Sequence, residues 1–414
     1  MYQLLKGMRV IEGASFIAAP SCGLNLLQLG AEVIRFDNIG GGFDWKRWPV
    51  SPQGDSFYWE GLNKGKKSVA IDLSRPGGRQ LAVDLITAPG PDRGVFVTNF
   101  PKGGFLGHAA LAQHRPDLIT VRVMGWNDGG SGVDYTVNAS VGLPFMTGGP
   151  EIGEAPVNHV LPAWDLMTGA YAAFATLAAE RHRLRTGQGQ EVTIPLSDVA
   201  LACLGHTGQI AEVLEHGDRP RHGNALFGAF GRDFVTADGE RVMVVAITRR
   251  QWTGLVASLG LQPAVAALEV SLQQSFERDE GLRFTHRDAL FPLFERAIGA
   301  RTLAEASAAF DANDVCWGRY RTLSQGLAGD SRLSLDAELF THLQHPSGLS
   351  YPAPGAMGRF GGVPRLPAAR APRLGEHTDE VLAQVLGLSA ARIGELHDAG
   401  LVASPAPVPW KDPP

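Results

Sequence analysis

The 414-residue chain has few cysteines, and none of them are paired in sequence. Its three cysteines, Cys22, Cys203 and Cys316, lie far apart and form no C-x-x-C motif. Disulfide-stabilised scaffolds and structural zinc sites both need closely spaced cysteines, so neither is expected. We therefore expect a protein of the reducing cytoplasm that holds no metal.

Long apolar segments and a strong charge imbalance are also missing. No run of about 18 apolar residues occurs, and the N-terminal MYQLLKGMRVIEGASF has no long apolar core followed by a cleavage site. We therefore expect neither a membrane span nor export. The formal net charge of −5 gives no basic face for nucleic acid or an anionic membrane.

What the sequence does contain is a regular alternation of apolar runs and helical segments. Short apolar runs predict strands at 8–12, 31–36, 67–73, 94–100 and 117–125, with helices between them. A long helix is predicted from Asp165 to Arg185, where the glycines of TGQGQ end it, and EVTIPL then predicts another strand. This alternation indicates a doubly wound α/β fold with a parallel sheet.

The pattern changes near residue 206. The Gly-rich RHGNALFGAFGRDF, a strand at 242–248 and amphipathic helices over 282–313 predict a smaller α+β domain spanning 206–334. Proline and glycine are dense over 345–377, which predicts an extended arm leading back to the first domain. The large domain is therefore expected to combine 1–205 and 335–414.

The first turn of the predicted sheet lacks the fingerprint of dinucleotide-binding proteins. The turn EGASFIAAPSCG contains no G-x-G-x-x-G, and Pro20 stands where the helix should begin. Those glycines let a pyrophosphate approach the helix N-terminus. NAD binding is therefore not expected, although the doubly wound fold is.

Six segments, in this order, resemble the class III CoA-transferase family. They are LGAEVIRFDNIGGGFDWKRWP, LNKGKKSVAIDLSRPGGR, VTNFPKG, AWDLMTG, RTGQGQEVTIPLSD and APRLGEHTDEVL. Each is weak alone, but their order along nearly the whole chain is specific. The family includes formyl-CoA transferase-like enzymes, crotonobetaine/carnitine CoA-transferases and α-methylacyl-CoA racemases. The resemblance implies a large Rossmann-like CoA-binding domain and an interlocked homodimer.

In this family the aspartate of the D-x-x-T-G segment is the nucleophile that takes up the acyl group, and Asp165 matches it. A carboxylate that attacks a thioester forms a mixed anhydride, and the returning CoA thiolate then gives an aspartyl-CoA thioester. A helix N-terminus should help Asp165 to stay ionised. The alternative is a plain helix N-cap, which is a common place for aspartate. Both roles can hold at once.

The resemblance also implies a CoA site in the large domain, with CoA entering as part of the substrate and no permanently bound cofactor. The residues that match CoA contacts in relatives are Phe16, Ile17, Ala18, Arg47, Ile71, Asn99 and Phe100. Relatives usually carry N-F-R-P-G where this chain has NFPKG, so the cationic contact either moves to Lys102 or is lost. Lys64, Lys66 and Lys67 are interpreted as a solvated turn rather than as phosphate ligands.

Two segments, VDYTVNASVGLPFMTG and VNHVLPAWDLMTG, resemble members that act on the CoA thioester of a C5 dicarboxylic acid. The implied reaction moves CoA within one molecule, from the C1 to the C4 carboxyl of 2-methylfumarate (mesaconate). Arg47, Arg249 and Arg250 are the cations considered for the distal carboxylate. His159 is expected either to hydrogen-bond the substrate or the nucleophile, or to pack in the core.

Two other activities of the family are considered. An intermolecular CoA-transferase would use the same Asp165 but pass CoA between two different acids. A racemase would need an acid/base pair, and Val133 stands where racemases carry the histidine of G-H-D-x-x-Y. The racemase is therefore disfavoured. No nucleic-acid or membrane partner is expected.

Overall fold

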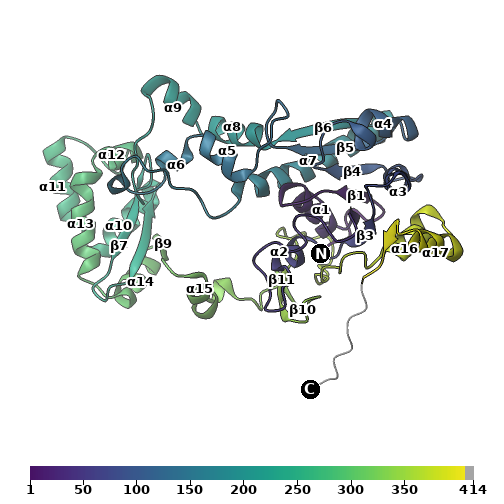
Figure 1. Cartoon of the computed structure of the whole chain (residues 1–414). Helices are drawn as coiled ribbons and strands as arrows, with labels where there is room; N and C mark the ends of the chain where they lie inside the picture. The colour runs from purple at the N-terminus through teal and green to yellow at the C-terminus, as the bar shows by residue number, and fades with distance from the viewer. Residues whose placement is uncertain (406–414) are drawn as a thin grey trace, which may run out of the picture. The chain divides into compact units, whose positions relative to one another are not determined.

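The computed structural model describes residues 1–405, which form two compact units (Figure 1). The first unit combines Met1–Val141, Val160–Ile210 and residues 335–405; the second combines Gly142–His159 and Ala211–Ser334. Residues 142–159, assigned to the large domain from the sequence, thus belong to the second unit. The reason is Arg221, whose guanidinium donates hydrogen bonds to the carbonyls of Thr147, Gly153 and Ala155.

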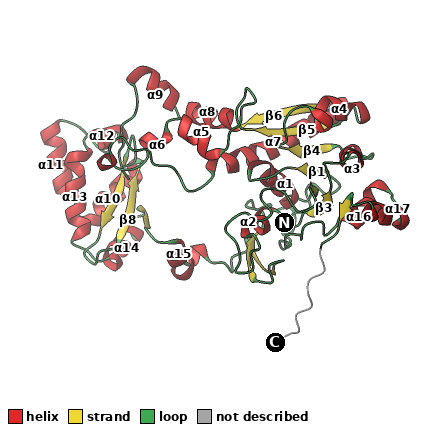
Figure 2. Ribbon diagram, viewed as in Figure 1, coloured by secondary structure: helices red, strands yellow, loops and turns green. Residues whose placement is uncertain are grey.

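The first unit is built on a sheet with strand order β12-β3-β2-β1-β4-β5-β6, of which Figure 2 labels β3, β1, β4, β5 and β6. Neighbouring strands are parallel, except that β12 runs antiparallel to β3. The order reverses at β1, which lies between β2 and β4, and such a point is where doubly wound sheets bind ligands. The strands are β1 (Arg9–Gly13), β2 (Glu32–Asp37), β3 (Lys67–Ile71), β4 (Val95–Thr98), β5 (Ile119–Met124), β6 (Gln190–Pro195) and β12 (Val402–Ala403).

Alternating side chains give the sheet two differently covered faces. Ile11, Ile34 and Phe36 point into an apolar core formed with α3 (Pro76–Thr87), α4 (His108–His114), α16 (Thr378–Leu386) and α17 (Ala390–Asp398). Glu12 points to the opposite face, under α1 (Ala18–Gln28), where a Cβ on Gly23 would lie 2.0 Å from Glu12 Oε2. Glycine therefore allows α1 to lie directly over a buried carboxylate.

Helix α7 (Ala163–Thr186) packs along α1 at a second glycine. A Cβ on Gly169 would lie 1.8 Å from Ser21 Oγ and 2.5 Å from the carbonyl oxygen of Ala18. Helix α7 ends at Gly187, whose φ of +74° is in the left-handed region, as the TGQGQ motif predicts. The other helices of this unit are α2 (Phe57–Leu62), α5 (Asp134–Ser140) and α8 (Leu196–His206).

The C-terminal part of the chain returns to strand β3. The backbone N–H of Ser68 donates to His377 Nδ1 at 3.2 Å, and that of Ala70 donates to Thr378 Oγ1 at 3.1 Å. The segment before this contact includes a hairpin of β10 (Phe340–Gln344) and β11 (Ser350–Pro354). The predicted large α/β domain made from both chain ends is confirmed.

The second unit contains an antiparallel sheet of order β7-β8-β9 packed with helices around an aromatic core that includes Phe230, Trp252 and Phe294. This confirms the predicted smaller α+β domain. Helix α9 (Gln209–His216) spans the boundary with the first unit. The strands are β7 (Phe230–Val235), β8 (Arg241–Ala246) and β9 (Cys316–Arg319), and the helices are α6 (Leu143–Met146), α10 (Arg249–Leu259), α11 (Gln262–Leu272), α12 (Glu280–Thr285), α13 (Arg287–Gly299), α14 (Leu303–Asp311) and α15 (Leu323–Gly329). Over residues 1–405, no helix has both the length and the apolar character needed to cross a membrane.

Candidate active site

The site begins where β1 and β4 end side by side. The backbone N–H of Ser15 donates to Asn99 Oδ1 at 3.1 Å, and Asn99 Nδ2 donates to the Ser15 carbonyl at 2.8 Å. The next residue, Phe16, has a φ of +68°, a left-handed conformation that a bulky residue adopts only when its surroundings hold it there. Two of the predicted CoA contacts, Phe16 and Asn99, therefore lie together at the reversal point of the sheet.

An aromatic and cationic wall continues from Phe16. Its ring stacks on Phe43 with centroids 6.0 Å apart and an interplanar angle of 3°. The Arg47 guanidinium lies 5.8 Å from the Phe16 ring centre and 5.5 Å from that of Tyr58. Arg47 and Phe43 are exposed, so this wall can meet a ligand.

Asp165 is the third residue of α7, not the residue that caps it. Pro162 occupies the N-cap position and gives no side-chain hydrogen bond. Instead, the backbone N–H groups of Trp164 and Asp165 donate to Asp134 Oδ2 at 2.7 and 3.2 Å. The N-cap role considered for Asp165 is therefore filled by Asp134 of α5.

The pKa of Asp165 is raised, whereas the sequence predicts that a helix N-terminus helps this residue to stay ionised. Burial raises it to about 7, the negative charge of Asp134 adds to the rise, and Arg47 opposes it. Burial is the largest cause of the rise. In addition, Asp134 accepts the backbone N–H groups of Trp164 and Asp165, which would otherwise favour a carboxylate, and adds a like charge. Near neutral pH, Asp165 thus has a substantial ionised fraction and is more basic than an ordinary carboxylate, which suits a nucleophile.

Tyr58, on α2, is a neighbour that the sequence analysis missed. Within residues 1–405 its hydroxyl is buried and has no hydrogen-bond partner. Burial raises the pKa of the phenol, Arg47 lowers it, and the charges of Asp165 and Asp44 raise it further. Tyr58 therefore stays protonated as a hydrogen-bond donor. The segment SFYWEGL does not predict this role, because the role depends on charged residues that lie near the ring only in the folded chain.

A buried ion network anchors the loop that carries this wall. Lys66 Nζ donates to both carboxylate oxygens of Glu12, at 2.8 and 2.9 Å. Arg35 binds Asp37 and also Asp44, at 2.9 Å. Asp44 lies in the loop between β2 and α2, next to Phe43, so the network fixes the base of that loop.

This network also corrects the interpretation of the neighbouring lysines. Lys66 is fully buried, and Lys64 is 5% exposed with its ammonium bonded to the Gly61 carbonyl. Lys67 pairs with Glu32 and Glu380. The solvated turn inferred from LNKGKKS is wrong for Lys64 and Lys66.

The remaining predicted CoA contacts differ in how accessible they are. Ile17 and Ala18 start α1, next to Phe16. Phe100 is half-buried, its carbonyl accepts from Arg122 Nη1 at 2.6 Å, and Lys102 in the same loop is exposed. Ile71 is completely buried in the apolar core, so its side chain offers no ligand contact.

Three predicted residues belong to the second unit. Arg249 is 77% exposed and pairs with Glu277 at 2.5 Å, and Arg250 pairs with Asp314. His159 is half-buried. Their substrate roles stay predictions.

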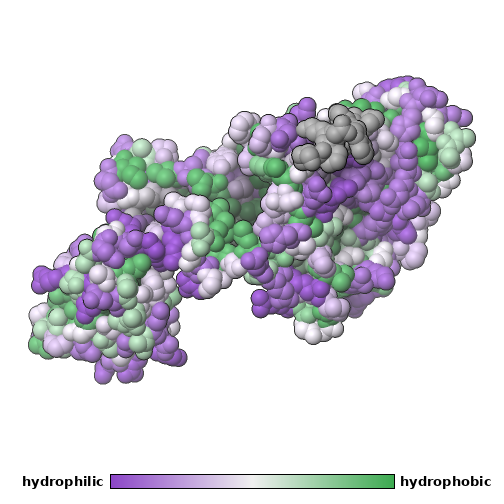
Figure 3. Space-filling view, turned by 90° about the horizontal axis from the view of Figure 1, so that it is seen from below, coloured by the Kyte–Doolittle hydropathy of each residue, from purple (hydrophilic) through white to green (hydrophobic). Residues whose placement is uncertain are grey.

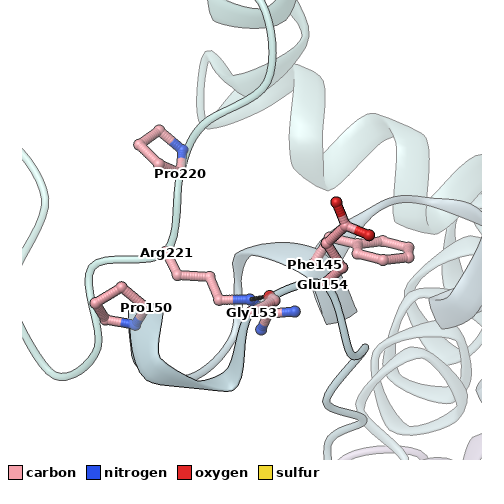
Figure 4. Close-up of a pocket in the computed structure, with 6 residues that line it drawn as sticks. All are labelled: Phe145, Pro150, Gly153, Glu154, Pro220 and Arg221. Carbon is pink, nitrogen blue, oxygen red and sulfur yellow. Dashed lines mark hydrogen bonds between the residues drawn. The ribbon is translucent and has the colours of Figure 1, made fainter.

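The second unit also contains a pocket of about 510 Å³ lined by Phe145, Pro150, Gly153, Glu154, Pro220 and Arg221 (Figure 4). The guanidinium of Arg221 donates hydrogen bonds to backbone carbonyls there. The pocket includes none of the predicted site residues.

Comparisons with known proteins show the family of this chain. The model of CoA-transferase family III matches residues 5–378. The chain is 53% identical over 407 residues to 2-methylfumaryl-CoA isomerase of Chloroflexus aurantiacus, covering 98% of this chain and 99% of that one. It is 27% identical over 410 residues to human succinyl-CoA:glutarate CoA-transferase, covering 96% and 90%. A crystal structure of a CAIB/BAIF family protein from Brucella suis matches with a TM-score of 0.74 and 25% identity over 93% of this chain and 100% of that one. The chain therefore belongs to CoA-transferase family III.

Proposed function

We propose that this enzyme converts 2-methylfumaryl-CoA into 3-methylfumaryl-CoA by moving CoA from the C1 to the C4 carboxyl of the same acid. The observation that carries the proposal is the 53% identity, over nearly both whole chains, to a protein named 2-methylfumaryl-CoA isomerase. The charge of Arg47 acts on Asp165, and both charges act on Tyr58, which is consistent with a site for acyl transfer.

The reaction balances with Asp165 as the covalent carrier. Its carboxylate attacks the thioester carbonyl, the C–S bond breaks, and a mixed anhydride and CoA thiolate form. The thiolate then attacks the Asp165 carbonyl, which releases the mesaconate dianion and leaves CoA on Asp165. Attack by the C4 carboxylate and return of the thiolate give the isomeric thioester and free Asp165.

Arg47 and Tyr58 supply the groups that this chemistry needs. The guanidinium of Arg47 can hold the distal carboxylate of the acid by charge-assisted hydrogen bonds. A buried hydroxyl without a partner costs about 1–3 kcal/mol, and an acyl oxygen that reaches Tyr58 would recover that cost. The CoA portion is proposed to follow Phe16, Ile17, Ala18, Asn99, Phe100 and Lys102 at the ends of β1 and β4, with Arg249 and His159 kept as proposed substrate contacts.

The first test is isomerisation of mesaconyl-C1-CoA with excess carbon-13-labelled free mesaconate present. Retention of the free dianion in a desolvated site makes recapture faster than exchange with solution. We expect the C4-thioester, separated by chromatography and weighed by mass spectrometry, to contain little label. Label in proportion to its share of total acid would instead identify an intermolecular CoA-transferase.

The second test concerns racemase activity. Val133 is the N-cap residue of α5 and is 50% exposed, and its side chain cannot exchange protons. In deuterated water we expect a chiral 2-methylacyl-CoA to keep its α-proton and its configuration, as followed by proton NMR. Rapid deuterium uptake without thioester migration would favour the racemase.

We further propose that two copies form the interlocked homodimer implied by the family and that the enzyme works in the cytoplasm. Large apolar side chains of α7 are exposed, among them Leu166, Met167, Tyr171 and Phe174. Figure 3 shows hydrophobic residues on the surface of the molecule among hydrophilic ones. Such a surface fits a subunit interface. Cys22, Cys203 and Cys316 are free thiols, which fits a reducing compartment.

A further inference from the structure

Helix α5 holds the residue before the nucleophile at two points. Asp134 and Asn138 lie one helical turn apart, and each is only 2% exposed. Asp134 Oδ2 accepts the Trp164 backbone N–H at 2.7 Å, and Asn138 Oδ1 accepts the Trp164 indole N–H at 3.1 Å. One helix therefore fixes both the main chain and the ring of Trp164.

The same turn of α7 is fixed from a second side. Gly169 lies four residues after Asp165, so the two share one face of α7. Any Cβ at Gly169 would collide with the Ala18 carbonyl at 2.5 Å, so this face lies against the start of α1. The direction in which Asp165 leaves the helix is thus set by α1 on one side and by α5 on the other.

Asp134 also acts through its charge. The groups whose charges act on Asp165 are Asp134 from α5 and Arg47 from the loop between β2 and α2, and the neutral Tyr58 phenol of α2 lies in the same field. Asp134 is the like charge among them, and it also accepts the backbone N–H groups of Trp164 and Asp165, which would otherwise stabilise a carboxylate. Both effects add to burial, which is the largest cause of the raised pKa of Asp165.

We propose that Asp134 and Asn138 form a clamp on Trp164 that aims Asp165, and that Asp134 is the positioning residue whose charge tunes the nucleophile. This inference rests on the proposed role of Asp165 as the acyl carrier. Asp134 acts through Asp165 and touches no reacting atom. Its effect must therefore appear in the pH dependence of Asp165 and not only in stability.

Two substitutions that keep the shape of the side chain test the clamp: one removes a carboxylate, and the other introduces one. Asp134→Asn keeps an oxygen for the Trp164 N–H but removes the charge, so the acidic limb of kcat/KM should move to lower pH by about one unit. Asn138→Asp keeps an oxygen for the indole N–H and adds a second carboxyl one turn from Asp134, so the limb should move to higher pH as that carboxyl ionises. The substrate groups titrate identically in every variant, so a difference from the wild type belongs to the enzyme.

The outcomes are separable. Circular dichroism and melting temperature establish which variants fold, and if Asp134→Asn does not fold, Asn138→Asp decides alone. Limbs that move in opposite directions support the proposal. A limb that stays at the wild-type pH in a folded variant overturns it, because a purely structural clamp would change stability and leave the limb in place.

A measurement without turnover separates this proposal from the proposed function. A water-soluble carbodiimide with an amine labels protonated carboxyl groups, and the labelled fraction of the Asp165 peptide can be followed by mass spectrometry as a function of pH. We expect the same shifts as in kcat/KM. If mesaconyl-C1-CoA is not a substrate but the labelling shifts occur, the proposed function fails and the clamp stands. Identical labelling curves for the wild type and the folded variants overturn the clamp whatever the substrate.

Discussion

Asp165→Ala is expected to lower turnover at least about a hundredfold, because removal of a covalent nucleophile normally costs more than that. Affinity for CoA should stay within several-fold of the wild type, since the carboxylate acts on the acyl carbon and not on the nucleotide. Turnover is measured by chromatographic separation of the C1- and C4-thioesters, and affinity by calorimetry with free CoA. A folded variant that keeps more than about one hundredth of wild-type turnover would contradict the covalent role.

A matched control exists within the same unit. Asp198 is also the third residue of a helix, α8, but it is exposed. Asp198→Ala should leave turnover unchanged. In the wild type, hydroxylamine added during turnover should convert Asp165 to a hydroxamate, detectable as a mass change on its peptide, while the Asp198 peptide stays unmodified.

Lys66→Met is expected to lower the free energy of unfolding of the first unit by about 3–5 kcal/mol, the usual cost of leaving one buried charge without its partner. The ammonium bonds both Glu12 oxygens and the Pro20 carbonyl, and both side chains of the ion pair are completely buried. Arg35 remains 3.7 Å from Glu12 and replaces only part of the lost attraction. Denaturant unfolding followed by circular dichroism measures the loss.

Lys67→Met is the control for this substitution. Lys67 bonds Glu32 and Glu380 at the surface, where an ion pair is worth about 0–1 kcal/mol. Burial already raises the pKa of Glu12, and without Lys66 it rises further. Protonation of Glu12 then removes the unpaired charge, so the loss in Lys66→Met should shrink as the pH falls. Equal losses in the two variants would show that the buried pair is not what stabilises the sheet.

The sequence predicts the structural features that are determined by residues within one short segment. The apolar runs predict β1 to β5 because a strand buried on both faces needs a continuous apolar run, and EVTIPL predicts the partly exposed edge strand β6. The motif around Asp165 predicts the nucleophile because the resemblance fixes it residue by residue. Gly169 in the same motif can be understood only with the structure, since the atoms it avoids belong to Ser21 and Ala18.

Other features depend on partners far away in the chain, and no local pattern predicts them. Lys66 lies in LNKGKKS, which looks like a solvated turn, and it is buried because Glu12, 54 residues earlier, faces it. Asp134 caps a helix that begins 29 residues later, at Ala163. Such pairs come together only when the sheet assembles, so the spacing of residues in the sequence does not predict which residues will pair.

The loop between β2 and α2 offers a route to altered substrate choice by protein engineering. It is tied to the buried network at Asp44, which is completely buried, whereas Phe43 beside it is 84% exposed and Arg47 is also exposed. Side chains at positions 43 and 47 can therefore be randomised while Asp44 keeps the loop in place. A library at these two positions, screened with dicarboxyl thioesters of different chain length, would change what the wall contacts without touching the helices that hold Asp165.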